Sequence, residues 1–443
     1  MMYLYPMKEQ LTVILFVTMG ALPWIPAHGF ESIYERAPIL YYEREPDNRV
    51  TRLLAQAQKE GFLSIGTDRE ILLELLARLE IPLESQLLVF SKTSAQNSRI
   101  APNTPRAIYF SDDVYIGWVQ GGEIEVASLD ERLGMVFHLI RLSDREDHRP
   151  PELVRERSCL NCHAGSSNQD LPGLMVRSVF PSDSGLPLFE AGTFHTRQSS
   201  PIHERWGGWY VTGEVESESH LGNAIATVVN QGVGGVALQP FASGRVDTLD
   251  ALFNAAPYPY GGQSDVVALM VLEHQTGVHN VLVEANLTTQ ATLYRHNEMK
   301  KAFGEPVEAP LSETNERILD RMADKVLHEM LYVDEVEVPG GIEGGVAFQN
   351  AFHANAKKST DGRSLKDFRL YGRLMKYRCS HLIYSEAFEN LPWEMHTRVL
   401  DKLHSILTRP TPWPDYSHLA DSEREHLLTI LSETVPNLPP SWE

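Results

Sequence analysis

The chain has 443 residues, of which 42% are hydrophobic and 22% charged, so it is long enough for two or three domains and has the composition of a globular protein. Its formal net charge of −20 argues against nucleic acid and anionic membrane surfaces as partners, because the long-range electrostatic field repels both. The same field would attract a basic electron-transfer protein.

The first residues have the pattern of a targeting signal, and we predict a signal peptide over residues 1–28. Lys8 precedes the apolar run at 11–22, and Ala27 offers a small residue for cleavage. The run is too short for a comfortable membrane span, with an uncleaved anchor as the alternative. No later segment is predicted to cross a bilayer. We therefore expect a periplasmic or secreted bacterial protein without a membrane span in its mature chain.

The region after the signal is predicted to begin with two helices and to continue as strands. Asp47 is expected to cap a helix that ends at Gly61. Thr67 and Glu70 form a capping box for a second helix that ends at Pro82. Short apolar runs, several of them alternating, then predict strands at 87–90, 107–110, 114–119, 123–127 and 133–142.

Five consecutive residues, Cys159-Leu160-Asn161-Cys162-His163, form the pattern C-x-x-C-H. Two thiols three positions apart can both form thioethers with the vinyl groups of a porphyrin, and the adjacent histidine is then held against the iron. With 3 Cys and 17 His in the chain, chance alone gives about 0.0008 such matches. We predict one covalent haem c, attached at Cys159 and Cys162 and ligated by His163. Export supports this prediction, because bacterial haem attachment occurs outside the cytoplasmic membrane.

Two other uses of these residues stay open. A disulfide between Cys159 and Cys162 would close a tight ring that is more often redox-active than structural. The two cysteines and His163 could instead bind zinc, but a closed zinc site needs a fourth ligand and the chain has no second cysteine pair. Cys379 is expected to be a buried free thiol.

The remaining elements change from strands to helices along the chain. A short helix at 153–157 is predicted to lead into Cys159. Strand-like segments follow at 175–180, 186–189 and 209–212, and Trp206-Gly207-Gly208-Trp209 is either a packed β corner or a contact surface for a flat ligand. Helices are then predicted at 264–302 with an interruption at Gly277, and at 312–331, 344–356, 365–385, 392–407 and 417–435.

This change of periodicity predicts an α+β fold. We expect a mixed α/β region at 29–245, which carries the haem, and a mainly α-helical region at 246–443.

The residue on the other side of the iron would decide the function, because Met or His there gives an electron carrier and an open position admits a substrate or gas. His274 is the leading candidate, since it lies on an otherwise apolar helix face. Its alternative role is a hydrogen-bonded core histidine. Met175 is a weaker candidate, with ordinary core packing as its alternative. His279 lies off that face and is expected to be exposed.

The stretch from Cys159 to His163 resembles c-type cytochromes, and this resemblance implies covalent haem c with His163 as an axial ligand. The small cytochrome c fold is all-helical with its motif near the start, whereas this motif follows predicted strands. More of the chain resembles a group of secreted bacterial proteins called cytochrome c domain-containing. That resemblance runs through the Trp118 region and residues 205–213, 270–274 and 378–380. It implies haem binding and electron transfer and supplies no substrate.

The sequence thus predicts an exported monohaem c-type cytochrome that transfers electrons to or from a redox partner protein. Two alternatives stay open: a haem-dependent oxidoreductase of the peroxidase or oxidase type, and a haem-based redox or gas sensor. Dihaem peroxidases carry two C-x-x-C-H motifs and this chain has one. The sequence assigns no catalytic residue and no oligomeric state.

Overall fold

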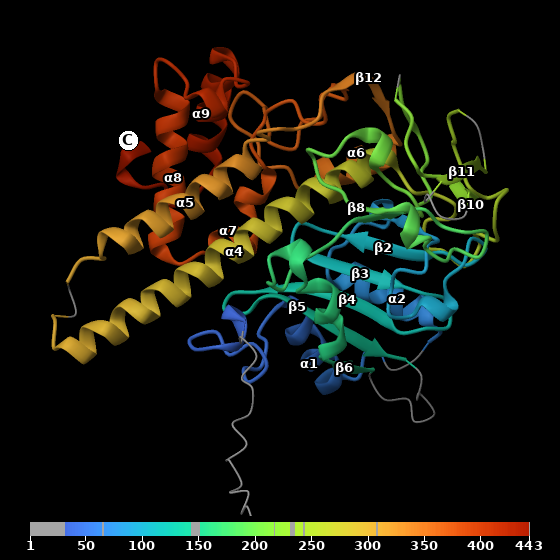
Figure 1. Ribbon diagram of the computed structural model, residues 1–443, viewed down its shortest axis with the longest axis horizontal. Coiled ribbons are helices and arrows are strands. Elements are labelled where there is room, and N and C mark those ends of the chain that lie inside the picture. The colour runs from blue at the N-terminus through green and yellow to red at the C-terminus, as the bar shows by residue number, and fades with distance from the viewer. Residues whose placement is uncertain are drawn as a thin grey trace, which may run out of the picture. The chain divides into compact units, whose positions relative to one another are not determined.

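A six-stranded antiparallel sheet is the centre of the fold (Figure 1). The computed structural model describes residues 32–63, 66–142, 151–216, 218–230, 235–241, 244–306 and 309–442, and the predicted signal peptide at 1–28 lies outside them. Each strand pairs with the next one in the chain: β1 Leu87–Val89, β2 Arg106–Phe110, β3 Val114–Trp118, β4 Ile124–Asp130, β5 Gly134–Arg141 and β6 Glu152–Val154. The five strands predicted between residues 87 and 142 are confirmed.

The two faces of this sheet pack against different helices, because successive side chains of a strand point to opposite sides. Tyr109 and Ile116 lie in the core shared with α1 (Arg49–Glu60) and α2 (Asp68–Arg78). Phe110 and Tyr115 lie in the core on the other side, shared with α4 (Val266–Phe303). Figure 1 shows α4 running past the sheet on the side away from α1.

Both N-terminal helices begin at capping residues, and the predicted cap is confirmed for α2 only. Thr67 accepts a hydrogen bond from the backbone of Glu70, whose carboxylate in turn accepts one from the backbone of Thr67. The cap of α1 is Asn48 rather than Asp47, because the Asn48 side chain accepts hydrogen bonds from Val50 and Thr51. The backbone N–H of Asp47 donates instead to the carboxylate of Asp130 in the sheet.

Short strands and turns connect this sheet to α4. Among them, β7 (Arg177–Val179) pairs with β8 (Thr193–His195), and β10 (Ala224–Asn230) pairs with β11 (Gly235–Pro240). A third small sheet joins β9 (Glu214–Val215) to two strands that follow α4 in the chain, β12 (Val338–Glu343) and β13 (Tyr371–Gly372). Of the predicted strand-like segments, the first contains β7. Residues 186–189 and 209–212 contribute isolated bridges only.

Two predictions for this region are resolved by its backbone pairing and packing. The helix expected at 153–157 is wrong, because Leu153 and Val154 pair with β5 as the sixth strand. The Trp206 to Trp209 run is a packed corner: Trp206 is fully buried, and a side chain at Gly207 would overlap the carbonyl oxygen of Val179.

Helix α4 is continuous through Gly277, where the sequence pattern predicts an interruption. The glycine leaves room for the neighbouring helix α5 (Glu313–Met330), because a β-carbon at this position would overlap the carboxylate of Glu329 unless that side chain moved. Among the described helices, α4 alone is long and apolar enough to cross a membrane, and 89% of its most apolar 18-residue window is buried inside the protein. That degree of burial is expected of a core helix.

The C-terminal part is mainly helical, apart from β12 and the segment between α6 and α7. Its helices after α5 are α6 (Val346–Ala354), α7 (Glu386–Glu389), α8 (Trp393–Thr408) and α9 (Asp421–Thr434). The helix predicted at 365–385 is wrong, because Leu370 and Gly372 have φ angles of 55° and 73°, which a right-handed helix does not accept. One hydrophobic core joins these helices to α4 and the sheet. The α+β fold is confirmed.

Candidate functional site

The predicted attachment residues lie on one short helical turn on the α4 side of the sheet. A 3-10 turn at Arg157–Cys159 leads into α3 (Leu160–His163). Residues three positions apart share one side of a helix, so Cys159 and Cys162 lie on the same side of this turn. Both thiols are free, Cys159 being half-buried and Cys162 exposed. This arrangement fits the two thioethers of a haem c.

The imidazole of His163 is held by the loop that follows it. Its Nδ1 lies 2.9 Å from the carbonyl oxygen of Gly173, ten residues later, and the Gly173 N–H donates to the His163 carbonyl at 2.8 Å. Asn168 also donates to that carbonyl. Metal-bound histidines usually donate one ring N–H to a carbonyl, which fixes the ring and leaves the other nitrogen for the metal. Burial lowers the pKa of His163, which favours the neutral, ligating form.

Asn280 on α4 fixes the same loop in place. Its side-chain oxygen accepts a hydrogen bond of 2.7 Å from the Leu174 N–H, and its amide donates to the Leu174 carbonyl at 2.9 Å. A β-carbon at Gly173 would lie 2.6 Å from the Asn280 oxygen, so the close approach requires glycine. The position of His163 is therefore set by α4 as well as by its own turn.

Aromatic and charged side chains of the sheet lie beside the motif. The ring of Phe137 on β5 lies 4.3 Å from the ring of His163. Arg106 and Glu125 form a 2.5 Å ion pair across the sheet, and both act electrostatically on the pKa of His163. The charge of Glu125 also acts on Cys159.

The two alternative uses of the motif receive no support from its surroundings. Burial first, and then the charge of Glu125, raises the pKa of Cys159 to about 11, so this thiol is protonated at neutral pH. A redox-active cysteine reacts as the thiolate. Within the described ranges, no group of three or more His, Cys, Asp or Glu side chains is arranged to hold a metal ion. Cys379 is buried as expected, and burial raises its pKa to about 12.

His274, the leading candidate for the second iron ligand, is buried in the protein core, and both of its ring nitrogens are hydrogen-bonded. Its Nδ1 lies 2.6 Å from the Gln198 side-chain oxygen, and its Nε2 lies 2.8 Å from the Ser380 hydroxyl. The ring also stacks on Tyr332 at 4.1 Å. Because both ring nitrogens are used, the geometry favours the alternative of a hydrogen-bonded core histidine.

His279 is buried, and the expectation that it is exposed is wrong. Its Nδ1 lies 2.9 Å from the hydroxyl of Tyr115 on β3. Helical periodicity fails as a guide here, because the sheet and the C-terminal segments cover α4 on several sides.

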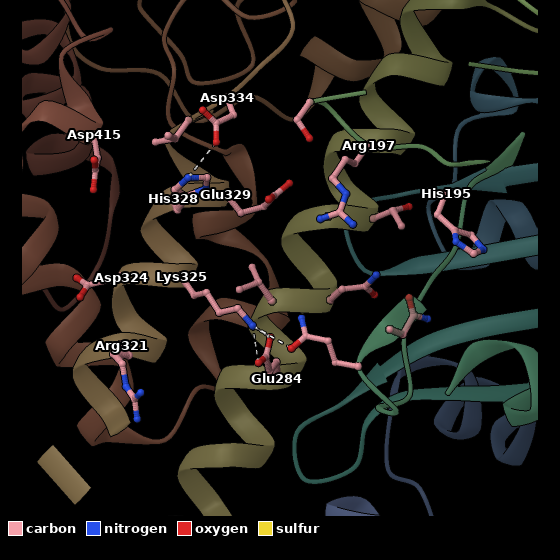
Figure 2. A pocket seen from close by; sticks show the side chains of 18 of the residues that line it. His195, Arg197, Glu284, Arg321, Asp324, Lys325, His328, Glu329, Asp334 and Asp415 are labelled. Atoms are coloured by element: carbon pink, nitrogen blue, oxygen red, sulfur yellow. Dashed lines mark hydrogen bonds and ion pairs between the residues drawn. The ribbon is translucent and has the colours of Figure 1, made fainter. Parts of the chain in front are cut away.

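A large cavity is bordered by the loop that follows His163. Its volume is about 1250 Å³, and it is lined by the loop at 167–169, by Met175, by α4 and α5, and by C-terminal residues (Figure 2). His163 is not one of its lining residues. Met175, the weaker candidate for the second iron ligand, is one of the lining residues.

Charged side chains dominate the wall formed by α4 and α5. Lys325 lies 2.6 Å from Glu284 and 3.0 Å from the Gln169 oxygen, so it links both helices to the loop after the motif. His328 lies 3.4 Å from Asp334. Figure 2 shows these pairs together with Arg197 and Glu329, which form no ion pair with each other. No sequence motif indicates this cavity.

Comparisons with protein-family models, with curated proteins and with solved structures found no match. Any assignment of function therefore rests on the site itself.

Proposed function

We propose that the chain is an exported monohaem c-type cytochrome that transfers electrons. The observation that carries the proposal is the hydrogen bond between the His163 ring and the Gly173 carbonyl, which orients a histidine next to two free thiols. Cys159 and Cys162 would hold the porphyrin, and His163 would ligate the iron through Nε2. Bound haem c would supply an iron that gains and loses one electron.

The protein residues around the motif would set the properties of the iron. The Gly173 carbonyl raises the electron donation of His163 when it accepts the Nδ1 proton. The Arg106–Glu125 pair places one positive and one negative charge near the ring. A net charge of −20 favours a basic redox partner.

A haem assay tests this proposal directly. The full chain is produced in bacteria with a haem-attachment system, and covalent haem is measured as the pyridine haemochrome after denaturation. We expect one haem per chain in the wild type and in Cys379→Ser, and loss of covalent haem in the double variant Cys159→Ser, Cys162→Ser. Cys379→Ser is the control because it removes a cysteine thiol outside the C-x-x-C-H motif. A wild-type chain without covalent haem would overturn the proposal.

A haem enzyme or sensor is the second candidate, and one observation favours it. Both ring nitrogens of His274 are hydrogen-bonded, and Met175 lines a cavity that His163 does not line. An iron that receives neither side chain as a ligand would have an open sixth position. A low-spin ferric spectrum that cyanide and CO leave unchanged supports the electron carrier, whereas a high-spin spectrum with rapid CO or peroxide reaction supports the enzyme or sensor.

A further inference from the structure

The two-stranded ribbon of β10 and β11 has an open edge at the periphery of the fold (Figure 1). No other strand of the described residues pairs with either of the two. On the outer side of β10, the Ala226 N–H donates to the Pro181 carbonyl at 2.6 Å. Among the described residues, no backbone hydrogen bond reaches β11 from outside the ribbon. The unpaired edge of β11 can therefore pair with a strand of another chain.

This edge lacks the usual protections against such pairing. Edge strands are commonly protected by charged side chains or by proline. Between Glu218 and Arg245 the sequence contains no Asp, Glu, Lys or Arg, although 22% of the chain is charged. Pro240 is the last residue of β11, so the preceding residues 235–239 keep their backbone N–H donors. Depletion of charged residues is also a mark of the centre of protein interfaces.

Apolar side chains lie beside the open edge. The strand register pairs Val228 with Val236 and Ala226 with Leu238, so these four residues share one face of the ribbon. Leu238 on β11 is 42% exposed, and Val228 on β10 is 53% exposed. Residues opposite each other on neighbouring strands pack together, so a strand added beside β11 would cover the flank of Leu238.

The sequence of β11 is complementary to itself in the antiparallel direction. Two identical strands related by a two-fold axis pair symmetrically about one residue, because opposite residues must share a face. Pairing about Ala237 places Val236 opposite Leu238 of the second copy and leaves Pro240 outside the paired stretch. Pairing about Leu238 would instead place Pro240 opposite Val236 and lose a backbone donor. The pairing about Ala237 is therefore favoured.

The absence of charge distinguishes a second copy from other partners. A basic redox protein is attracted by acidic side chains, and anionic membranes are bound through Lys and Arg together with aromatic side chains. Residues 224–228 and 235–240 contain none of these. Two chains with a net charge of −20 repel each other, and the uncharged ribbon lets them meet without placing like charges in contact.

We propose that two copies of this chain associate through β11, which pairs antiparallel with its counterpart about Ala237. The two ribbons then form one four-stranded sheet. Backbone hydrogen bonds along the open edge supply affinity, and contacts between Val236 and Leu238 of the two copies fix the register. This inference is independent of the proposed haem function.

Sedimentation equilibrium of the full chain measures the association. We expect a monomer–dimer equilibrium that tightens when NaCl is raised from about 20 mM to about 500 mM, because salt screens the repulsion between two negative chains. A chain that stays monomeric at about 100 μM in both salt concentrations would overturn the inference. Weaker association at high salt would also overturn it, because that result indicates an interface of opposite charges.

A lysine substitution locates the interface. Leu238→Lys should weaken dimerisation by about tenfold or more, because it places a charge at the paired edge of each copy. Met299→Lys is the matched control, since Met299 is a 59% exposed apolar residue of α4 outside the ribbon. If Leu238→Lys dimerises like the wild type, β11 is not the interface.

Disulfide cross-linking tests the register, in the background of Cys159→Ser and Cys162→Ser, where only the buried Cys379 remains. Ala237→Cys should form a disulfide-linked dimer, because directly opposite residues lie within disulfide reach. Thr227→Cys is the matched control: Thr227 pairs with Ala237 but lies on the inner strand β10. The Thr227 α-carbons of the two copies would be about 14 Å apart, which is too far for a disulfide. Equal cross-linking of the two variants, or none in Ala237→Cys, would contradict pairing about Ala237.

Discussion

The Nδ1 atom of His163 lies 2.9 Å from the carbonyl oxygen of Gly173, and the same glycine donates its N–H to the His163 carbonyl. These two contacts close a loop that α4 holds through Asn280. The protein alone therefore fixes the ring, which is the preorganisation expected of a metal ligand.

Gly173→Ala tests the importance of this loop. The added methyl group would meet the Asn280 oxygen at 2.6 Å, so the loop must shift, and we expect a loss of about 1–3 kcal/mol in the free energy of unfolding. The reduction potential of the haem-loaded protein should also change, because the His163 hydrogen bond is displaced. Urea unfolding and a spectroscopic redox titration measure both effects. Unchanged stability together with an unchanged potential would contradict this packing.

His274→Ala should leave the haem spectrum unchanged in both oxidation states. The substitution removes the partner of both Gln198 and Ser380 in a buried site, so we expect the free energy of unfolding to fall by about 2–4 kcal/mol. Absorption spectra and urea unfolding on the same sample separate the two effects. A shift of the Soret and α bands would instead identify His274 as an iron ligand and would require its hydrogen bonds to rearrange.

Local sequence patterns predict the parts of this fold that depend on neighbouring residues. The capping box at Thr67 follows from the chemistry of its own side chains. The strands of the six-stranded sheet follow from the alternation of apolar and polar residues within short windows. The C-x-x-C-H pattern likewise needs only five consecutive residues to indicate the candidate attachment site. Prediction fails at Leu153 and Val154, because their edge-strand conformation depends on pairing with β5.

The surroundings of the site cannot be predicted in this way, since they depend on contacts between distant segments. Asn280 lies 106 residues from the Leu174 backbone that it binds, and Gln198 lies 76 residues from His274. The turn at Pro172 and Gly173, soon after the motif, is a usable signal for the carbonyl that holds His163. Arg197 and Glu329 carry no such signal, because only the tertiary fold brings them to one cavity.

Buried histidines should make the protein less stable below neutral pH. Burial lowers the pKa of His279 to about 4, against about 6.5 in an unfolded chain. As the pH falls from about 6.5 to about 4, His279 therefore binds a proton in the unfolded state but stays neutral in the folded state. This difference in proton binding lowers the free energy of unfolding as the pH falls. This group alone should remove about 2 kcal/mol of stability between about pH 8 and about pH 5.

His279→Gln tests this pH dependence, with His203→Gln, a change at an exposed histidine, as the control. The His279 variant should be less stable at about pH 8, because Tyr115 loses its partner, yet its stability should fall less steeply toward about pH 5. Urea unfolding at several pH values measures the slope. Equal slopes in the wild type and the His279 variant would show that this histidine does not titrate in this range.

Arg205 and Glu273 form a buried ion pair, with atoms 2.7 Å apart and side chains 2% and 0% exposed. Arg205→Met should cost about 3–5 kcal/mol, because it leaves a carboxylate buried without its cation. Burial already raises the pKa of Glu273. Without Arg205, the Glu273 carboxyl should therefore be protonated in the folded variant, and the stability of the variant should fall as the pH rises and favours the ionised form. The double variant Arg205→Met, Glu273→Leu also removes the unpaired carboxylate. It should lose less stability than the single variant and show no added pH dependence.

Equal losses of stability in the single and double variants would contradict this role of the ion pair. They would show instead that this part of the core is stabilised by the hydrogen bonds from Arg205 to the Ser200 and Gln198 carbonyls.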